Sequence, residues 1–453
     1  MEALERLRRR LAGAMTGSVS LPGEPAYVQA VSIWAKPRIL PRLVAHCANV
    51  ADVQLAIRSA RDAGLALSVR GGGHNWTGCA LCDGLTLDLS RMNAAGPIGP
   101  DATIEVGGGA KGTHVFAVTD PAGMAPVLGS VADIGLAGLV TGGGYGPLMR
   151  QFGLACDNLR AATVVLADGQ QVRAAEDGDS ELYWAIRGGG GNFGVVTSME
   201  LHLRPLASVR SGILLFPFDS GDSILPRLSE IWANAPLELD VQIGIVPAPD
   251  GAPVVYLSPT WSGDPGGADA ALAPLYANGD RIAVDIRDQP FGSSRAFFDQ
   301  YIVKGLVTSA DTLWLREWND EIAGIVMDAM RRRPSQFCFV LCHDFSGAAA
   351  EISAPSTAFG LRKPHIWFEI IAPADPDRES DGRVEADWAR GVTESLVPFA
   401  FPGGYPNLLG PSQHDRIQSS FGENASRLLA AKKTYDPENM FRSAIPLPDA
   451  GLS

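Results

Sequence analysis

The sequence predicts an α+β protein with more than one domain, and its composition, segment pattern and glycine content together indicate this. The chain of 453 residues is 46% hydrophobic and 19% charged, which is ordinary globular composition with ample material for a core. At about 150 residues per domain the length suggests about three domains, and two larger ones fit equally well. Short β-like runs alternate with helical segments, and many of the 51 glycines occur in clusters without periodicity. Dominant disorder and a collagen-like repeat are therefore excluded.

The charge balance and the N-terminal segment exclude several classes of partner. A net charge of −13, from 37 basic and 50 acidic residues, argues against nucleic acid or an anionic membrane as a partner. Leu4, Leu7 and Leu11 have helical spacing and predict a short amphipathic helix packed on the body, not a secretory signal. No apolar run approaches the ~18 residues that a membrane span needs, so we expect a cytoplasmic protein. Cys79-x-x-Cys82 lacks a second half-site, so we expect reduced thiols and no metal.

Residues 40–205 alternate β-like and helical runs and hold most of the glycine clusters. Residues 50–61 have the apolar spacing of a helix, which we expect to end before Gly64. Residues 66–70 predict a strand that Gly71 interrupts. A helix followed by a strand in this way is a unit of an α/β or α+β domain.

The chain changes character after residue 205. Strands are predicted at residues 211–216, 253–257 and 365–370, with helical stretches between them. Cys338 and Cys342 lie in an apolar run that predicts one more buried strand. Residues 206–394 therefore form a second α+β domain with a larger sheet. The tail from about residue 395 ends in a helix over 424–435.

Four glycine clusters lie within the first part of the chain, at residues 71–73, 107–109, 142–144 and 188–191. Glycine permits positive φ and a close approach of the backbone to a ligand, so its N–H groups can surround phosphates or a ring. Four clusters in one region favour a large cofactor that lies across several loops. None of them is a G-x-G-x-x-G loop that opens a helix, and no G-K-[ST] follows, so neither a nicotinamide-type fold nor a P-loop is supported.

Four segments of the sequence are each moderately specific for one family of proteins, and they are a strong signal when all four occur together in this order. They are residues 69–75 (Val-Arg-Gly-Gly-Gly-His-Asn) with 83–93, residues 142–158 (beginning Gly-Gly-Gly-Tyr-Gly), residues 182–196 and residues 435–442 (Tyr-Asp-Pro-Glu-Asn-Met-Phe-Arg). In these segments the chain resembles the vanillyl-alcohol oxidase family of flavoproteins, in its berberine-bridge-enzyme-like and 6-hydroxynicotine-oxidase-like branch. The resemblance implies an FAD-binding domain over residues 1–205 that is completed by residues 395–453. A substrate-binding domain over residues 206–394 is inserted between them.

The resemblance also implies which residues hold the FAD. The implied cofactor-binding residues are Arg70, Gly71, Gly72, Gly73, His74, Asn75, Gly78, Ser130, Ile134, Gly138, Gly142, Gly143, Gly144, Asp157, Gly194, Val195, Val196, Tyr405 and Asn407. His74 matches the histidine that is bonded covalently to the flavin 8α-methyl group in this branch. Bicovalent members have a cysteine where this chain has Val131 beside Ser130, so we expect monocovalent FAD.

Two residues are candidates for the chemistry. Flavin-dependent oxidation needs a base for the substrate's O–H or N–H, and by resemblance this base lies on a strand of the substrate domain. On the strand at 365–370, Glu369 shares one face with His365 and Trp367, and burial in a cleft would raise the pKa of its carboxyl group. The alternative is a solvated outer face with an ordinary glutamate. Tyr145 is either a packing residue near the cofactor or a proton donor.

We therefore expect an FAD-dependent oxidoreductase that oxidises a small aromatic or polycyclic natural-product intermediate by hydride transfer to flavin N5, with O2 as final acceptor. Ile134 occupies the family position whose size is thought to govern oxygen access, so a dehydrogenase with another acceptor is an alternative. A non-redox cyclisation or isomerisation is another alternative, because Ala444 stands where relatives carry an asparagine near the flavin. A third alternative is a binding protein on the same fold that holds no flavin. His74 and the glycines that flank it argue against this alternative.

Overall fold

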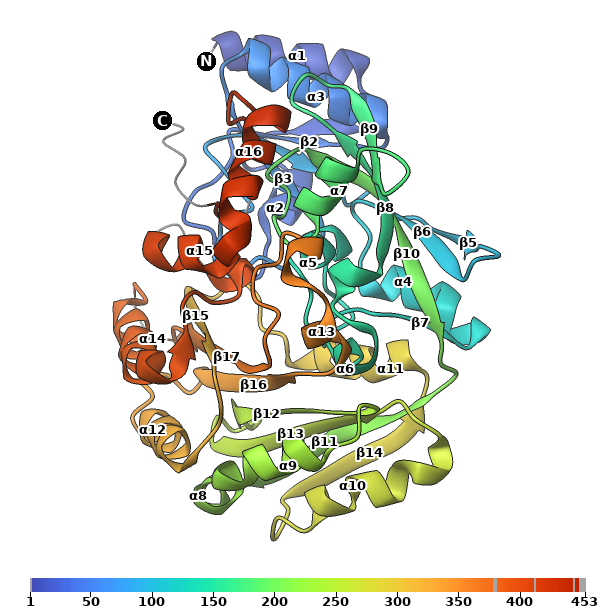
Figure 1. Cartoon of the computed structure of the whole chain (residues 1–453). Helices are drawn as coiled ribbons and strands as arrows, with labels where there is room; N and C mark the ends of the chain where they lie inside the picture. Colours follow the sequence, from blue (N-terminus) through green and yellow to red (C-terminus); the bar gives the residue numbers. More distant parts are fainter. Residues whose placement is uncertain (1, 378–380, 411–412, 443–444, 448–453) are drawn as a thin grey trace.

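The computed structural model describes residues 2–377, 381–410, 413–442 and 445–447. Two β-sheets lie toward the end of the molecule where both termini are found, and a larger sheet lies at the opposite end (Figure 1). Ala444 is outside the described residues. Within the described ranges, no helix combines the length and the apolar character that crossing a bilayer requires.

The strands form sheets of four, six and eight. The four-stranded sheet has the order β1-β2-β4-β3 and consists of β1 (Ser18–Ser20), β2 (Leu43–His46), β3 (Ala66–Arg70) and β4 (Gly84–Asp88). The antiparallel second sheet has the order β5-β6-β10-β8-β9, with β7 also paired to β10, and consists of β5 (Ala95–Ile98), β6 (Thr103–Gly107), β7 (Met124–Pro126), β8 (Leu159–Val165), β9 (Gln171–Ala175) and β10 (Val195–Pro205). The antiparallel third sheet has the order β14-β11-β13-β12-β16-β17-β15-β18 and consists of β11 (Val209–Pro217), β12 (Leu239–Pro247), β13 (Pro253–Trp261), β14 (Ala283–Gln289), β15 (Thr308–Leu315), β16 (Phe339–Phe345), β17 (His365–Pro373) and β18 (Ala400–Phe401).

Helices surround these sheets. They are α1 (Glu2–Ala14), α2 (Pro25–Val31), α3 (Val50–Asp62), α4 (Gly112–Thr119), α5 (Leu136–Thr141), α6 (Met149–Phe152), α7 (Ser180–Ile186), α8 (Gly221–Ile224), α9 (Leu228–Asn234), α10 (Ala268–Tyr276), α11 (Phe291–Ala296), α12 (Asp320–Arg331), α13 (Ala348–Glu351), α14 (Arg383–Leu396), α15 (His414–Phe421) and α16 (Ala425–Tyr435). The α+β class is confirmed.

Helix α3 and strand β3 show why the local prediction succeeded. The Asn49 side chain accepts a hydrogen bond from the Asp52 N–H and so caps the first turn of α3. Val53, Ala56, Ile57 and Ala60 recur at helical spacing and are buried. The predicted helix at 50–61 and strand at 66–70 are confirmed, as are the N-terminal and C-terminal helices and the strands around 211–216, 253–257, 338–342 and 365–370.

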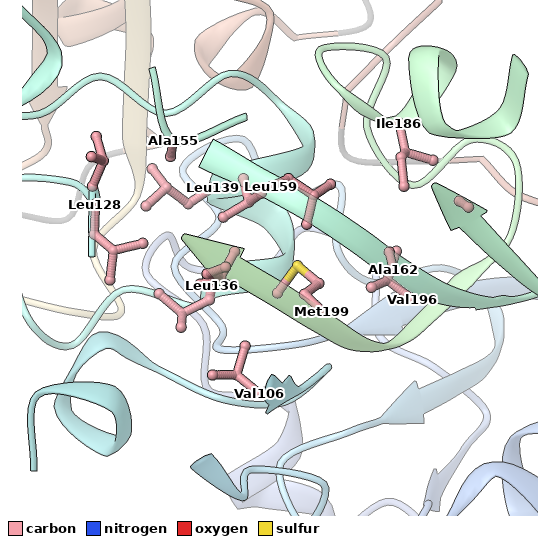
Figure 2. Packing of buried hydrophobic residues seen from close by; sticks show 14 of the residues in the cluster. Val106, Leu128, Leu136, Leu139, Ala155, Leu159, Ala162, Ile186, Val196 and Met199 are labelled. Carbon is pink, nitrogen blue, oxygen red and sulfur yellow. The ribbon is translucent and has the colours of Figure 1, made fainter. Parts of the chain in front are cut away.

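The six-stranded sheet packs on helices α5 and α7 through one apolar cluster. Figure 2 shows this packing, with Ala162 from β8 and Met199 from β10 on the sheet side. Leu136 and Leu139 come from α5, and Ile186 comes from α7. Because α5 leads directly into the glycines at 142–144, this packing holds that loop against the sheet.

The eight-stranded sheet has two faces of different character. Ile366, Phe368 and Ile370 of β17 belong to the core that this sheet forms with α9, α12 and α14. Trp367 belongs instead to an aromatic cluster with Tyr145 and other residues of the FAD-binding part. Successive side chains of a strand point to opposite faces, so the face that carries Trp367 and Glu369 is turned toward the rest of the chain.

The chain passes between the two larger sheets at the junction of β10 and β11, where the predicted boundary at residue 205 falls (Figure 1). The return lies later than the predicted residue 394. Ala400 and Phe401 form β18, which still pairs with β15 in the eight-stranded sheet. We therefore propose that the second part of the FAD-binding domain begins after Phe401.

The C-terminal tail is held by a buried ion pair. Lys432 donates hydrogen bonds to the Asp436 carboxylate (2.6 Å), the Asn192 carbonyl (2.8 Å) and the Phe441 carbonyl (2.8 Å). The Asp436 carboxylate also accepts from the N–H groups of Met440 and Phe441. One buried cation thus joins helix α16, the tail after it and the glycine-rich loop before Val195.

We expect Lys432→Ala to lower the free energy of unfolding by about 3–5 kcal/mol, because it leaves the Asp436 carboxylate buried without its cation. Urea unfolding followed by circular dichroism measures this. Arg390→Ala, which removes one partner of the exposed Arg390–Asp387 pair, is the matched control and should change little. Equal stability of Lys432→Ala and the wild type would contradict the assignment of the ion pair as the anchor of the tail.

Candidate functional site

A cavity lies where the four-stranded sheet, the six-stranded sheet and the C-terminal tail meet. It has a volume of about 130 Å³. Its lining comes from separate parts of the chain and includes Leu67, Ser68, Val69, Gly71, Cys79, Ala80, Leu89, Gly108, Ala137, Gly138, Thr141, Gly191, Gly194, Val195, Val196, Asn407, Phe441, Arg442 and Ile445. The structure therefore brings residues 67–71 and 79–89, residues 137–141, residues 191–196, and Asn407 with Phe441, Arg442 and Ile445 to one place.

The loop of residues 71–73 passes so close to another loop that side chains are excluded. A β-carbon on Gly72 would lie 2.2 Å from the Gly135 Cα, and one on Gly135 would lie 2.5 Å from the Gly72 nitrogen. Both neighbours are backbone atoms, so neither loop can yield to an added methyl group. This crossing places the loop that carries His74 against the loop that carries Ile134.

His74 packs beside two tryptophans that also contact each other. Its ring centroid is 4.7 Å from that of Trp34 and 5.8 Å from that of Trp76. The Nδ1 atom is buried and has no hydrogen-bond partner among the described residues. Burial, followed by the charge of Lys304, lowers the pKa of His74 to about 4. The imidazole is therefore neutral at pH 7, and a nitrogen of this ring is available for a partner that the protein itself does not supply.

The loop that carries Ser130 and Ile134 is fixed by charged groups. The Asp299 carboxylate accepts from the N–H groups of Ala132 (3.0 Å) and Asp133 (2.9 Å). Asp133 pairs with Lys111 at 2.5 Å and also with Lys304. Because Asp299 and Lys304 come from residues 206–394, the inserted part of the chain holds this loop in place beside His74.

Other predicted cofactor residues in the first loop hold the loop itself. Arg70 donates to the Asp88 carboxylate at 2.9 Å, and Asp88 in turn pairs with His46. The Asn75 side chain accepts from the Ala80 N–H. Gly78 has a φ of +78°, which a residue with a side chain rarely adopts. These three residues shape the wall of the cavity without lining it.

Asp157 lies away from the cavity, in a buried ion pair. Its two carboxylate oxygens accept from the Arg362 guanidinium at 2.7 and 2.8 Å, and one of them also accepts from the Leu154 N–H. A bidentate pair of this kind uses both oxygens. We therefore propose that Asp157 joins the loop after α6 to the inserted domain and does not contact the cofactor.

The glycines at 142–144 and the segment at 405–407 meet at the edge of the cavity. The Tyr405 hydroxyl accepts from the Gly144 N–H (3.1 Å) and from the Asn407 amide (2.6 Å). A β-carbon on Gly142 would lie 2.2 Å from the Asn407 amide, and one on Gly143 would lie 2.8 Å from the Phe359 ring. Because Gly142 has no side chain, the Asn407 amide can occupy this space and line the cavity.

Glu369 lies on the face of the eight-stranded sheet that is turned toward this edge. Thr312 and Leu341 are its register neighbours on the adjacent strands, and no described residue hydrogen-bonds to its carboxyl group. Burial raises the pKa of Glu369 to about 8. Such a carboxyl group can exchange a proton near neutral pH, which an ordinary surface glutamate cannot.

Tyr145 is enclosed in a hydrogen-bond network that joins the two parts of the molecule. His365 uses Nδ1 to donate to the Lys363 carbonyl (2.7 Å), so its Nε2 is the acceptor for the Tyr145 hydroxyl (2.9 Å). The same hydroxyl accepts from the Trp314 indole N–H at 3.0 Å. Burial raises the pKa of Tyr145 well above its ordinary value. With its proton already engaged, Tyr145 fits an anchoring role, and we no longer propose it as a proton donor.

Sequence reasoning missed three polar residues on the same sheet face. His343 bonds to the Gln242 amide at 2.7 Å and stacks on Trp367, with ring centroids 4.9 Å apart. The Tyr256 hydroxyl reaches the Gln242 amide oxygen at 3.4 Å. A detectable signal did exist, because Gln242 and Tyr256 interrupt the apolar strands β12 and β13 on one face only.

Comparisons with known proteins agree with this site. Residues 41–175 match the FAD binding domain model, and residues 404–448 match the "Berberine and berberine like" model. An FAD-linked oxidoreductase from Dictyostelium discoideum is 28% identical over 89% of this chain and 88% of its own length. The structure of 6-hydroxy-D-nicotine oxidase from Arthrobacter nicotinovorans superposes with a TM-score of 0.85 and 25% identity, over 95% of this chain and 97% of that one. A glycine-to-alanine variant of berberine bridge enzyme, described as a reticuline dehydrogenase, shares the fold at 20% identity with a TM-score of 0.85, over 98% and 99%.

We expect Tyr145→Phe to lower the free energy of unfolding by about 1–3 kcal/mol, because the Trp314 N–H and the His365 Nε2 atom lose their common partner in a buried site. Thermal and urea unfolding measure this change, with Tyr301→Phe as an exposed control that should have no effect. The rate of flavin reduction should stay within a few-fold of wild type. A loss of that rate at unchanged stability would restore Tyr145 as a proton donor.

Proposed function

The chain belongs to the berberine-bridge-enzyme-like branch of the FAD-linked oxidoreductases, and on this premise we propose that it oxidises a small aromatic or polycyclic natural-product intermediate. When bound, FAD supplies the hydride acceptor, N5, for a C–H carbon of the substrate, and O2 is the proposed final acceptor. The observation that carries this proposal is the pairing of a cofactor cavity with two titratable groups. Gly71, in the loop of His74, lines the cavity, and Glu369 of β17 lies near Tyr405, whose hydroxyl binds the cavity-lining Asn407.

The residues around the cavity fit an FAD that is held through His74. The unpartnered Nδ1 atom is where a covalent bond to the flavin 8α-methyl group would form, and the neutral ring has a lone pair free for that bond. The crossing of Gly72 and Gly135 leaves backbone groups, in place of side chains, to surround the cofactor. Val131 and Ser130 offer no thiol, so a single covalent bond is proposed.

Glu369 is the proposed base. A carboxylate surrounded by protein takes a proton from a substrate O–H or N–H more readily than an exposed one, because its pKa is close to the working pH. Tyr405 lies near Glu369 and does not itself line the cavity, but its hydrogen bond with Asn407 orients the amide that lines the cavity. The aromatic rings of Trp34 and Trp76 beside His74, and of Trp367 on the strand of Glu369, are suited to packing against an aromatic substrate.

A dehydrogenase that uses another acceptor is the second candidate. Ile134 packs against the core of the six-stranded sheet. A β-carbon added to Gly129 would lie 3.6 Å from the Ile134 Cδ1 atom, so this side chain fills the space beside that glycine. A berberine bridge enzyme variant in which alanine replaces one glycine, and so adds one methyl group, is described as a reticuline dehydrogenase. Flavin bleaching by substrate under nitrogen followed by oxygen consumption in air supports the oxidase. Bleaching without oxygen consumption supports the dehydrogenase, and no bleaching by any compound of a broad panel supports a non-redox reaction.

The covalent link predicts where the flavin remains after denaturation. In acid-precipitated wild-type protein we expect the yellow chromophore to stay with the chain and to map to the peptide that contains His74. In His74→Ala it should pass into the supernatant, whereas His202→Ala, the control, should retain it. Flavin that is released from the wild type would remove the covalent role of His74, and protein that takes up no FAD would contradict the proposed function.

The raised pKa of Glu369 predicts a pH dependence. Below pH 8 most of this carboxyl group carries a proton and cannot act as a base, so the rate of flavin reduction should rise with pH and level off above about 8. Stopped-flow reduction under nitrogen measures this, with the first compound that bleaches the flavin. Glu369→Gln should be slower by about 10²–10⁴ and should lose this rise, while Glu317→Gln should match wild type. A wild-type profile that is flat from pH 6 to 9 would contradict the role of Glu369 as base.

A further inference from the structure

Arg295 of α11 is a buried cation without a carboxylate partner. Its side chain is 2% exposed. The guanidinium donates to three hydroxyl oxygens, those of Ser294 (3.1 Å), Ser211 (2.9 Å) and Thr260 (3.1 Å). No carboxylate of the described chain lies within 4.0 Å of it, in contrast to Arg362, which meets Asp157. A buried charge that lacks an ion of opposite sign is unfavourable, so this arrangement indicates that an anion arrives from outside.

The aromatic neighbours of Arg295 do not neutralise its charge. The guanidinium carbon is 5.6 Å from the Phe291 ring centroid and 5.1 Å from that of Phe298. Contacts of this kind stabilise a cation much less than a carboxylate partner does. They also make the surroundings of Arg295 aromatic.

Two further buried polar atoms on this sheet face lack partners. Asp240 is the register neighbour of Thr260, which is itself the register neighbour of Ser211, so these residues form one row across β12, β13 and β11. Neither the Asp240 Oδ1 atom nor the His343 Nδ1 atom has a hydrogen-bond partner among the described residues. Buried polar atoms are nearly always hydrogen-bonded, so unpartnered ones beside an unpaired arginine indicate a place for a ligand.

The charges near Arg295 supply the missing anion only in part. Burial, and after it the charge of Arg295, lowers the pKa of His343 to about 3, so this ring is neutral. Burial raises the pKa of Asp240 to about 7, while Arg150 and Arg295 oppose the rise. Asp240 is therefore protonated in a large share of molecules at neutral pH and can then donate a hydrogen bond to an anion.

The segment after Arg295 connects this polar group to the proposed flavin site. Phe298 packs edge-on against Tyr256, with ring centroids 6.5 Å apart. Asp299, the next residue, binds the backbone of the loop that carries Ile134, which crosses the loop of His74. Asp240 and His343, whose atoms lack partners, thus lie on the sheet face that Glu369 and Trp367 share. Residues 295–299 connect this face to the Ile134 loop, which crosses the loop of His74.

We propose that Arg295 binds a carboxylate group of the substrate, so that the enzyme acts on an aromatic carboxylate. This inference rests on the proposed function, because it assigns the substrate class to the same site. Arginine is suited to the role because its planar fork can pair with both oxygens of a carboxylate. The row that includes Thr260 holds the guanidinium, and the unpartnered Asp240 and His343 atoms offer further hydrogen bonds to the bound group.

Benzoate and its neutral counterpart benzamide test this proposal on the purified holoenzyme. Quenching of tryptophan fluorescence reports binding without requiring bound FAD, and the flavin spectrum reports it independently. We expect wild type to bind benzoate about tenfold or more tightly than benzamide. Arg295→Gln should lose about tenfold or more in benzoate affinity with benzamide unchanged, and Arg390→Gln, the exposed control, should match wild type.

Equal affinity of wild type for benzoate and benzamide would overturn the proposal, and so would wild-type benzoate binding by a folded Arg295→Gln. If that variant does not fold, two others decide. Arg295→Lys keeps the charge without the fork and should bind benzoate several-fold more weakly. Asp240→Asn removes the nearby acid and should bind it at least as tightly as wild type. The opposite result in either variant contradicts the proposal. A colourless protein that takes up no FAD would instead contradict the proposed function, while the fluorescence titration remains readable.

Discussion

The candidate site depends on backbone segments that lie closer together than a β-carbon permits. Gly72 and Gly135 cross with no room for a methyl group, and Gly142 yields the space that the Asn407 amide occupies. A loop made this way presents N–H and C=O groups to a ligand, and it cannot move without unpacking the helix or sheet behind it. The cofactor cavity, the placement of His74 and the position of the Ile134 loop all follow from these close approaches.

Buried polar groups separate into two kinds. Those that hold the molecule together meet a counter-charge or a hydrogen-bond partner, as in the Lys432–Asp436 hub, the Arg362–Asp157 pair and the Tyr145–His365 bond. Those at the proposed site lack partners, namely the His74 Nδ1 and His343 Nδ1 atoms and the Asp240 Oδ1 atom. Unpaired buried groups are unfavourable for folding, and bound ligands would supply the partners that these three atoms lack.

The sequence predicted more of the fold than of the chemistry. Helix α3, strand β3 and the strands of the large sheet follow from local spacing and capping, because each of these signals lies within a few residues. The two faces of β17 also follow from alternation, which put Glu369 and Trp367 together. The roles of Tyr145 and Asp157 did not follow, because their partners His365 and Arg362 lie 220 and 205 residues away. The continuation of the large sheet to Phe401 depends equally on a distant strand, β15.

By itself the sequence determined the α+β class, the family resemblance and the residues of the cofactor loops, since all of these are written in short contiguous motifs. Only the tertiary structure decided which side chains keep an unpartnered atom and which are consumed by an ion pair. It also decided that Arg295, Asp240 and His343 share one face with Glu369, although nothing near them in the chain marks them. The physical reason is that burial and pairing are properties of the packed interior, where segments far apart in the chain supply or withhold each partner.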